Sequence, residues 1–193
     1  MIKTKKDLEY YIQEDRRVYG RKMQRSWRQS ISNKLFPNNN IRYLWCLRHL
    51  EYHANNKGLL HYLGMLYWER RRARLQALTG IELYANCAGP GIFLPHGKVV
   101  VSGGAKLGRN CKLNSDVTIG EQGRLHHHGN ALIGDNVYIG TGARIIGAVR
   151  IADGVVIGAN AVVTKDILEP NTTWAGSPAK KMTDKGSEDF IPQ

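Results

Sequence analysis

The chain has 193 residues, a formal net charge of +12 and 42% hydrophobic residues. This suits one repeat domain with a smaller appendage, and no stretch approaches the ~20 apolar residues of a membrane-spanning helix. The cysteines Cys46, Cys87 and Cys111 are odd in number and lack metal-site spacing, which favours buried thiols in a reducing compartment. The first residues lack the apolar region of a secretory signal, so we expect a cytoplasmic protein.

The positive charge is concentrated in residues 1–80, which hold 17 Lys or Arg against 6 Asp or Glu, a net charge of +11. Nucleic-acid binding is one interpretation, but the repeat domain has no nucleic-acid motif and no platform of aromatic residues alternates with the charges. We therefore expect no nucleic-acid partner. A solvated helical face explains the charge most simply, and weak attraction to an anionic membrane surface or to the phosphates of a ligand are the alternatives.

Three helices are predicted in this basic N-terminal domain, residues 1–80. Thr4 with Asp7 resembles a capping box at the start of the first helix. Asn40 is expected to cap the second helix, and Gly80 is expected to end the third. The expected helices span residues 4–19, 41–54 and about 58–78, with a basic irregular segment over 20–40.

From Ile81 the pattern changes to strands and turns, and an aliphatic residue returns at every sixth position over residues 99–168. A strand has a period of two and a helix one of about 3.6, so neither explains this spacing. One short strand with one tight turn does, and three such units would close a triangular coil with the aliphatic anchors inside. A β-sandwich, the alternative, would not keep one register over so many units. The anchors are Val101, Leu107, Leu113, Ile119, Ile133, Ile139, Ile145, Ile151, Ile157 and Val163.

The period is interrupted between Ile119 and Ile133, whose spacing exceeds two hexapeptides by two positions. The interruption is polar and contains three consecutive histidines, 126–128. We expect it to leave the regular coil as a loop on the working face. The pattern ends after Ile167, and residues 184–193 resemble a frayed tail.

These repeats and their flanking motifs resemble the hexapeptide-repeat acyltransferases, and especially the short serine O-acetyltransferases of bacterial polysaccharide gene clusters. The resemblance implies a mainly β fold, a left-handed parallel β-helix over residues 81–183 preceded by the α-helical segment. It also implies a homotrimer, with a hexamer as the alternative, because the family's active site is shared between neighbouring prisms. The motifs that carry the resemblance are Gly89–His96, Asn110–Gly120, Ile133–Gly140, Ile157–Val163 and Ala175–Lys180.

His96 is the candidate catalytic base, because it interrupts an apolar run where the first coils form. A neutral imidazole, with a pKa of about 6.5, can take the proton of a hydroxyl that attacks a thioester. In the resembled enzymes a histidine at this place acts in that way without an acyl-enzyme. The family orients it with an Asp about fifteen residues earlier. Here Glu82, fourteen residues earlier, is the nearest candidate, and a plain surface carboxylate is the alternative for it.

A second family histidine helps to bind the amino-acid acceptor, and its place falls on Asn130 here, with His126 and His128 close enough to replace it. This departure puts L-serine in doubt as the acceptor and favours a sugar hydroxyl or amine as the alternative. A zinc site on His96 and two histidines of the loop is a rival interpretation. Three adjacent histidines alternate in direction and cannot all meet one ion, whereas His96 with two of them stays geometrically possible; the sequence favours no metal.

The resemblance implies acetyl-CoA as the acyl donor, in a groove between neighbouring subunits. Small residues would let the pantetheine arm approach the backbone, and lysines would pair with the phosphates. The same residues could instead be ordinary turn residues and exposed lysines. The candidates are Gly120, Thr141, Ala159, Lys165 and Lys180.

The sequence thus predicts an acetyl-CoA-dependent O-acetyltransferase with L-serine as its first candidate acceptor. A sugar O- or N-acetyltransferase of polysaccharide biosynthesis is the nearest alternative. A non-catalytic β-helix that binds a membrane or an acidic partner through its basic helices is the alternative from another class.

Overall fold

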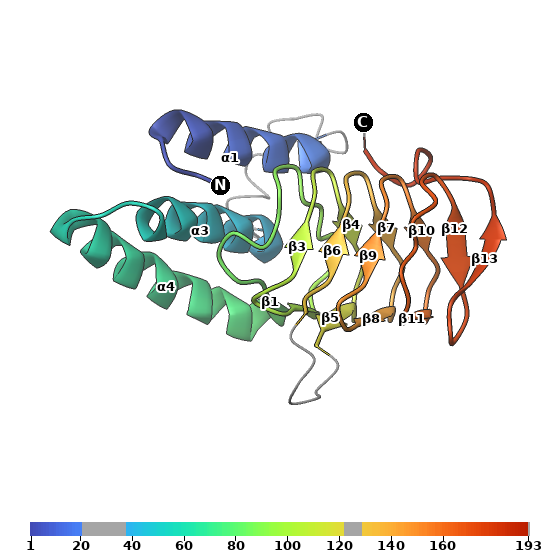
Figure 1. The fold of residues 1–193 in the computed structure, drawn as a ribbon. Helices are drawn as coiled ribbons and strands as arrows, with labels where there is room; N and C mark the ends of the chain where they lie inside the picture. The colour runs from blue at the N-terminus through green and yellow to red at the C-terminus, as the bar shows by residue number, and fades with distance from the viewer. Residues whose placement is uncertain (21–37, 122–128, 193) are drawn as a thin grey trace.

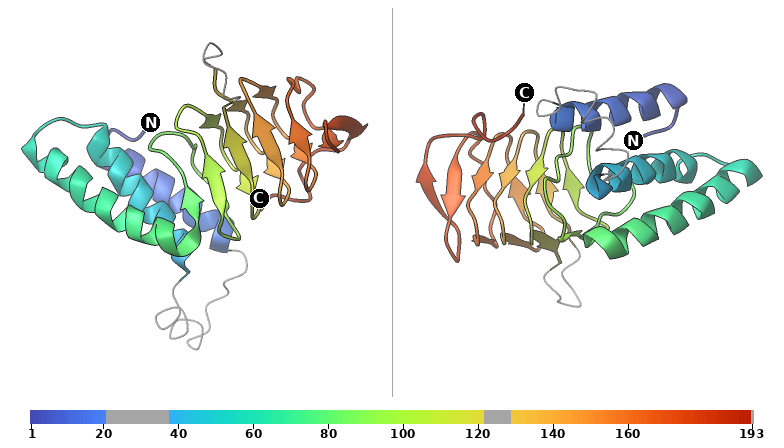
Figure 2. Two further views of the ribbon diagram at one scale, coloured as in Figure 1. Left: turned by 90° about the horizontal axis from the view of Figure 1, so that it is seen from below. Right: turned by 180° about the vertical axis from the view of Figure 1, so that it is seen from behind.

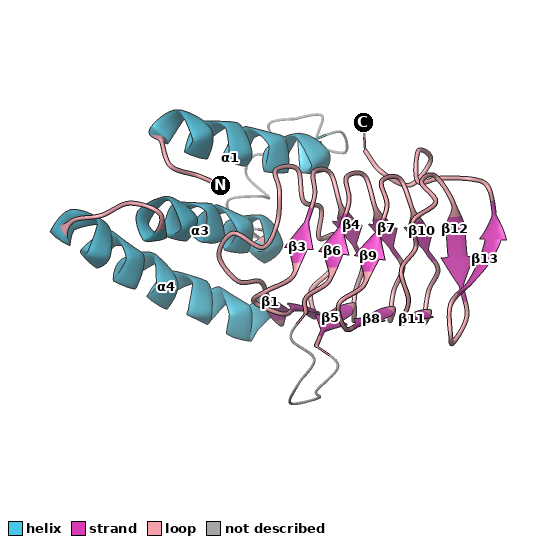
Figure 3. Cartoon of the chain, in the orientation of Figure 1, coloured by secondary structure: helices cyan, strands magenta, loops and turns pink. Residues whose placement is uncertain are grey.

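A computed structural model of the protein describes residues 1–20, 38–121 and 129–192. In these ranges, three helices lie at one end of a triangular prism of short strands (Figure 1; Figure 3). Two further views show the same division, with the helices extending away from the first coils (Figure 2). The irregular segment expected over residues 20–40 falls largely outside the described ranges.

The three helices begin and end close to their predicted positions. Asp7 and Thr4 form the predicted capping box: the Asp7 carboxylate accepts from the Thr4 N–H at 2.8 Å, and the Thr4 hydroxyl accepts from the Asp7 N–H at 3.1 Å. The predicted cap at Asn40 is wrong, because Asn38 caps that helix and accepts from the Asn40 N–H at 2.9 Å. Gly80 ends the last helix as predicted, with a left-handed φ of 67°. The helices are α1 (Lys5–Gly20), α3 (Asn39–Ala54) and α4 (Leu59–Thr79).

The strands of the prism are β1 (Ile81–Glu82), β2 (Val99–Val101), β3 (Lys106–Leu107), β4 (Lys112–Leu113), β5 (Thr118–Gly120), β6 (Leu132–Ile133), β7 (Tyr138–Ile139), β8 (Arg144–Ile146), β9 (Arg150–Ile151), β10 (Val156–Ile157), β11 (Val162–Val163), β12 (Thr173–Ala175) and β13 (Lys180–Thr183). Each side of the prism is one sheet, and only β13 pairs antiparallel within the described chain. We name each side after a central strand: the β8 side (β1-β2-β5-β8-β11), the β6 side (β3-β6-β9) and the β7 side (β4-β7-β10-β12-β13).

One coil of the prism takes three hexapeptides, as the pairing of Ile81 with Val99 shows. All ten predicted anchors face inward and are at most 5% exposed, so the predicted register is confirmed. The core continues into the helices, because Tyr43 of α3 is buried and its hydroxyl accepts from the Leu83 N–H at 2.9 Å.

The division into domains at residues 80 and 183 stays a prediction. Within the described ranges, no helix is long and apolar enough to cross a membrane.

The interruption in the repeats is larger than the sequence suggested. It connects β5 to β6, which lie on neighbouring sides, so it replaces one hexapeptide and not two. The paired residues that straddle it, Lys112 with Tyr138 and Thr118 with Arg144, are separated by one coil and eight further positions. The insertion is therefore eight residues long, and its residues 122–128 lie outside the described chain.

The frayed tail predicted at residues 184–193 is wrong for the part that the structure describes. Ser187 is buried, and its N–H donates to the carbonyl of Gly154 at 3.0 Å. The ring of Phe190 lies 4.8 Å from the ring of Tyr138. The tail therefore covers outward-facing side chains of the β7 side.

Candidate active site

Three of the predicted site residues lie on one edge of the prism, where the β7 side turns into the β8 side. His96 lies in the turn before β2, Thr141 in the turn before β8 and Ala159 in the turn before β11, and all three are exposed. The last two turns stack directly, since the Asn160 N–H donates to the Thr141 carbonyl at 2.8 Å. Three coils separate His96 from Ala159, and coils about 4.8 Å apart place them roughly 14 Å apart along this edge. We call it the His96 edge.

The turn that carries His96 is one residue longer than the corresponding turn of the next coil, between β4 and β5. Phe93 pairs with Lys112, and Val100 pairs with Thr118. The chain therefore takes seven residues from Phe93 to Val100, but only six between their partners on the next coil. An extra residue between paired strands bends the chain locally. His96 lies in this longer turn, where its imidazole is open to a ligand along the edge.

The helices hold the backbone just before His96. The buried hydroxyl of Tyr19 in α1 accepts from the Leu94 N–H at 3.0 Å and donates to the Leu94 carbonyl at 2.9 Å. Asn40 of α3 donates to the same carbonyl at 3.0 Å. Burial raises the pKa of the Tyr19 hydroxyl, so it stays protonated and keeps its donor role. The Tyr19 ring also packs edge to face against Phe93, at 4.7 Å between ring centres.

The end of α4 holds the backbone just after His96. The Lys98 N–H donates to the Thr79 carbonyl at 2.8 Å. A Cβ atom on Gly97 would lie 2.0 Å from that same oxygen, closer than any side chain tolerates. The turn is therefore fixed on both sides by elements of the N-terminal region, and glycine is required within it.

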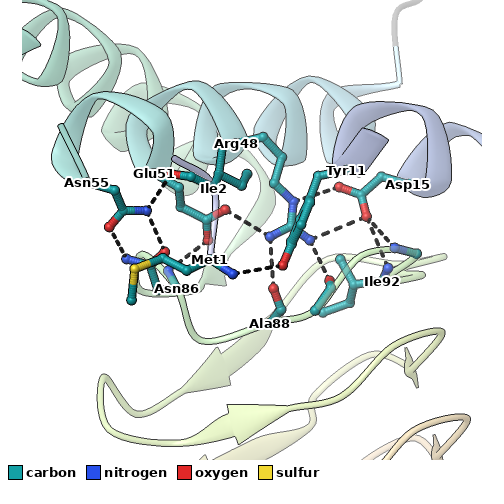
Figure 4. Close-up of polar contacts among 12 residues, drawn as sticks. Met1, Ile2, Tyr11, Asp15, Arg48, Glu51, Asn55, Asn86, Ala88 and Ile92 are labelled. Atoms are coloured by element: carbon teal, nitrogen blue, oxygen red, sulfur yellow. Dashed lines mark hydrogen bonds and ion pairs between the residues drawn. The ribbon is translucent and has the colours of Figure 1, made fainter. Parts of the chain in front are cut away.

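A buried ion cluster ties α1 and α3 to the first coil (Figure 4). The guanidinium of Arg48 is fully buried, and it pairs with Asp15 at 2.8 Å and with Glu51 at 3.0 Å. It also donates to the carbonyls of Ala88 at 2.9 Å and Gly89 at 2.7 Å. Burial alone would lower the pKa of Arg48, but the two carboxylates outweigh it and raise that pKa, so the side chain stays charged.

The carboxylates of the cluster reach the backbone of the first coil as well. Asp15 accepts from the N–H groups of Gly91 at 2.8 Å and Ile92 at 3.1 Å. Glu51 accepts from the Asn86 N–H at 2.7 Å. These contacts fix the coil that leads into the His96 turn. Sequence reasoning missed the cluster, although its signal was present: Arg48 and Glu51 fall on the apolar face of the second predicted helix.

Glu82 does not meet His96 within this chain. It pairs with Val100 in the β8 side, and its carboxylate accepts from the Tyr84 hydroxyl at 3.3 Å. Among the described residues, no hydrogen bond or ion pair links His96 to a carboxylate. The role of Glu82 as the orienting acid stays a prediction.

Three of the remaining candidates lie away from the His96 edge. Gly120, Asn130 and Lys165 lie where the β8 side turns into the β6 side, which we call the loop edge because the insertion leaves there. The Asn130 side-chain oxygen is buried and has no hydrogen-bond partner in the described chain. Lys180 lies in β13. His126 and His128 fall outside the described residues. No group of three His, Cys, Asp or Glu side chains among residues 1–20, 38–121 and 129–192 is arranged to hold a metal ion.

The repeats and the prism define the class of protein. Residues 130–165 match the family of bacterial transferase hexapeptide repeats (six repeats). This match, the strand pairing above and the solved structures described next give the fold as a left-handed parallel β-helix of hexapeptide repeats after a helical N-terminal segment, as predicted.

Within this class, the chain resembles serine acetyltransferases. That of Helicobacter pylori is 38% identical over 108 residues, which cover 55% of this chain and 63% of the relative. The crystal structure of the Brucella abortus enzyme aligns with a TM-score of 0.72 at 22% identity, covering 95% of this chain and 72% of that one. Soybean serine acetyltransferase complexed with serine aligns with a TM-score of 0.64 at 28% identity, covering 91% and 69%. The chain spans less than two thirds of the length of the curated relatives it matches first.

Proposed function

We propose that this protein is a serine O-acetyltransferase that uses acetyl-CoA. The observation that carries the proposal is the His96 edge. There the exposed imidazole of His96 lies on the same edge of the prism as two small turn residues, Thr141 and Ala159. The likeness to serine acetyltransferases supports the choice of acceptor. One solved relative holds serine, as stated above, and the Brucella abortus enzyme is also known in complex with coenzyme A.

In this proposal His96 takes the proton of the serine hydroxyl as its oxygen attacks the thioester carbon. The tetrahedral intermediate then breaks its C–S bond and releases the thiolate of coenzyme A, which takes the proton back from the imidazolium. The acetyl group passes directly to serine, with no acyl-enzyme. Backbone N–H groups near the turn would stabilise the oxyanion of the intermediate. The contacts of Tyr19 and Thr79 would hold the imidazole in place during these steps.

The acyl donor would lie along the His96 edge. The exposed turns at Thr141 and Ala159 leave room for the pantetheine arm, and Lys165 and Lys180 would pair with the phosphates. Gly120, Asn130 and Lys165, however, lie on the loop edge, so a single prism does not bring both groups together. A homotrimer that sets the His96 edge of one prism against the loop edge of its neighbour would complete the site. Whether two trimers join as a hexamer depends on the helices.

The substitution His96→Asn tests the proposal. We expect serine-dependent release of free thiol from acetyl-CoA to fall at least about 100-fold, the usual contribution of a general base. His61→Asn is the matched control, because His61 lies in α4 and contacts His53 instead of the prism turns. Full serine-dependent thiol release by the His96→Asn protein would contradict the proposal.

A sugar acceptor is the second candidate function. The observation in its favour is Asn130, which stands where the resembled family has its acceptor-binding histidine. A panel of serine, sugars and amino sugars, assayed for thiol release with the same enzyme, separates the two functions. Release with a sugar and none with serine would favour the second, and no release with any acceptor would favour a non-catalytic binding protein.

A further inference from the structure

Helix α4 presents an apolar surface that nothing in the described chain covers. Its first half extends away from the prism, at the far end of the molecule (Figure 1). Each of six side chains there is 47–82% exposed, a high value for large apolar and aromatic groups. We call the α4 surface the group Leu59, Leu60, Tyr62, Leu63, Leu66 and Tyr67.

These six residues form one face of the helix. At about 100° per residue they fall within a single arc, opposite the residues that pack on α3. On that opposite face, Trp68 stacks on His49 with ring centres 4.4 Å apart, and Leu75 is buried. The first half of α4 thus carries apolar or aromatic side chains on both faces, which is typical of a helix covered on both sides. One side of the helix is covered by α3, and the other side is exposed in the described chain.

The charges around the α4 surface indicate what that partner is. Arg70 and Arg74 continue the same helix face and are exposed, and Lys57 lies exposed just before the helix. The only acidic residue of α4 is Glu69, which is paired with Arg72 at 2.6 Å. The surface therefore combines apolar side chains with positive charges that form no ion pair within the described ranges.

We propose that the α4 surface binds the anionic surface of a lipid bilayer. Leucines would enter the boundary of the acyl chains, tyrosines suit the polar interface, and arginines pair with lipid phosphates. Arg70 lies seven residues beyond Leu63, or about 10 Å along the helix, which lets a tilted helix insert its first half while Arg70 stays at the headgroups. A second copy of the chain fits less well, because it would bring the same positive charges together. This inference goes beyond the proposed function and does not depend on it.

The test uses the full-length protein and sedimentation with vesicles. We expect binding to vesicles of phosphatidylcholine mixed with phosphatidylglycerol, weaker binding as salt rises, and little binding to phosphatidylcholine alone. The variant Leu60→Glu/Leu63→Glu should lower the affinity at least tenfold. Leu168→Glu is the matched control, because Leu168 is 66% exposed on the prism, and it should bind as the unmodified protein does.

Two outcomes would overturn the proposal. One is vesicle binding that the leucine variant leaves unchanged. The other is no binding of the unmodified protein to anionic vesicles; if that protein then forms an oligomer that the variant dissociates in analytical ultracentrifugation, a second copy is the partner. Serine-dependent thiol release should be unchanged in the leucine variant, which separates this test from that of His96.

Discussion

Replacing Arg48 by Met should destabilise the protein severely. The substitution leaves the carboxylates of Asp15 and Glu51 buried without their cation, and removing one partner of a buried ion pair costs about 3–5 kcal/mol. The carbonyls of Ala88 and Gly89 also lose a donor, at about 1 kcal/mol each. The expected loss in the free energy of unfolding is therefore about 5–7 kcal/mol. Urea unfolding followed by circular dichroism measures it.

Two further variants make this prediction decisive. Arg48→Met combined with Asp15→Asn and Glu51→Gln should recover at least about 2 kcal/mol, because the stranded charges are gone. Arg109→Met removes an exposed pair with Asp135, in which the arginine side chain is 65% exposed, and should cost less than about 1 kcal/mol. If the Arg48→Met protein lies within about 1 kcal/mol of the unmodified protein, the cluster does not stabilise the junction as argued.

Three other predictions concern the site and the core. Gly97→Ala should shift the His96 turn off the Thr79 carbonyl and reduce kcat for acetyl transfer about tenfold or more, measured by thiol release. Tyr19→Phe removes the hydroxyl that bridges both backbone groups of Leu94 and should cost about 1–2 kcal/mol in urea unfolding, with a lower kcat and an unchanged KM for serine. Burial raises the pKa of the Cys111 thiol to about 12, so the unfolded chain loses its proton first, and the free energy of unfolding should fall as pH rises above about 8.5.

Each of these has a control. Gly20→Ala meets no atom within 4 Å and should leave kcat unchanged. Tyr10→Phe alters an exposed tyrosine of the same helix as Tyr19 and should be neutral in urea. Cys111→Ala should remove part of the dependence of stability on alkaline pH. An equal slope in the Cys111→Ala protein would show that other groups cause it.

Much of the fold follows from local sequence signals. A hexapeptide contains its own strand and turn, so the spacing of the anchors from Val101 to Val163 was enough to predict the prism and its inward register. The cap at Thr4 and the end at Gly80 are equally local, because each depends on residues within one helical turn.

Other features depended on pairings between distant residues. The stretch between Ile119 and Ile133 fits either one hexapeptide with eight extra residues or two hexapeptides with two, and only the pairing of Lys112 with Tyr138 distinguishes these. The packing of Phe190 on Tyr138 likewise has no local signal, since several coils of the chain separate them in sequence.

The sequence by itself determined the repeat and the helices, because each of these depends on a few neighbouring residues, and the resemblance that it carries proposed His96 as the base. Only the tertiary structure decided that Thr141 and Ala159 share an edge with His96 while Asn130 lies on another. It also decided that Arg48 of α3 and Asp15 of α1 close on the first coil. The physical reason is that burial and strand register select these partners, and both are properties of the packed chain.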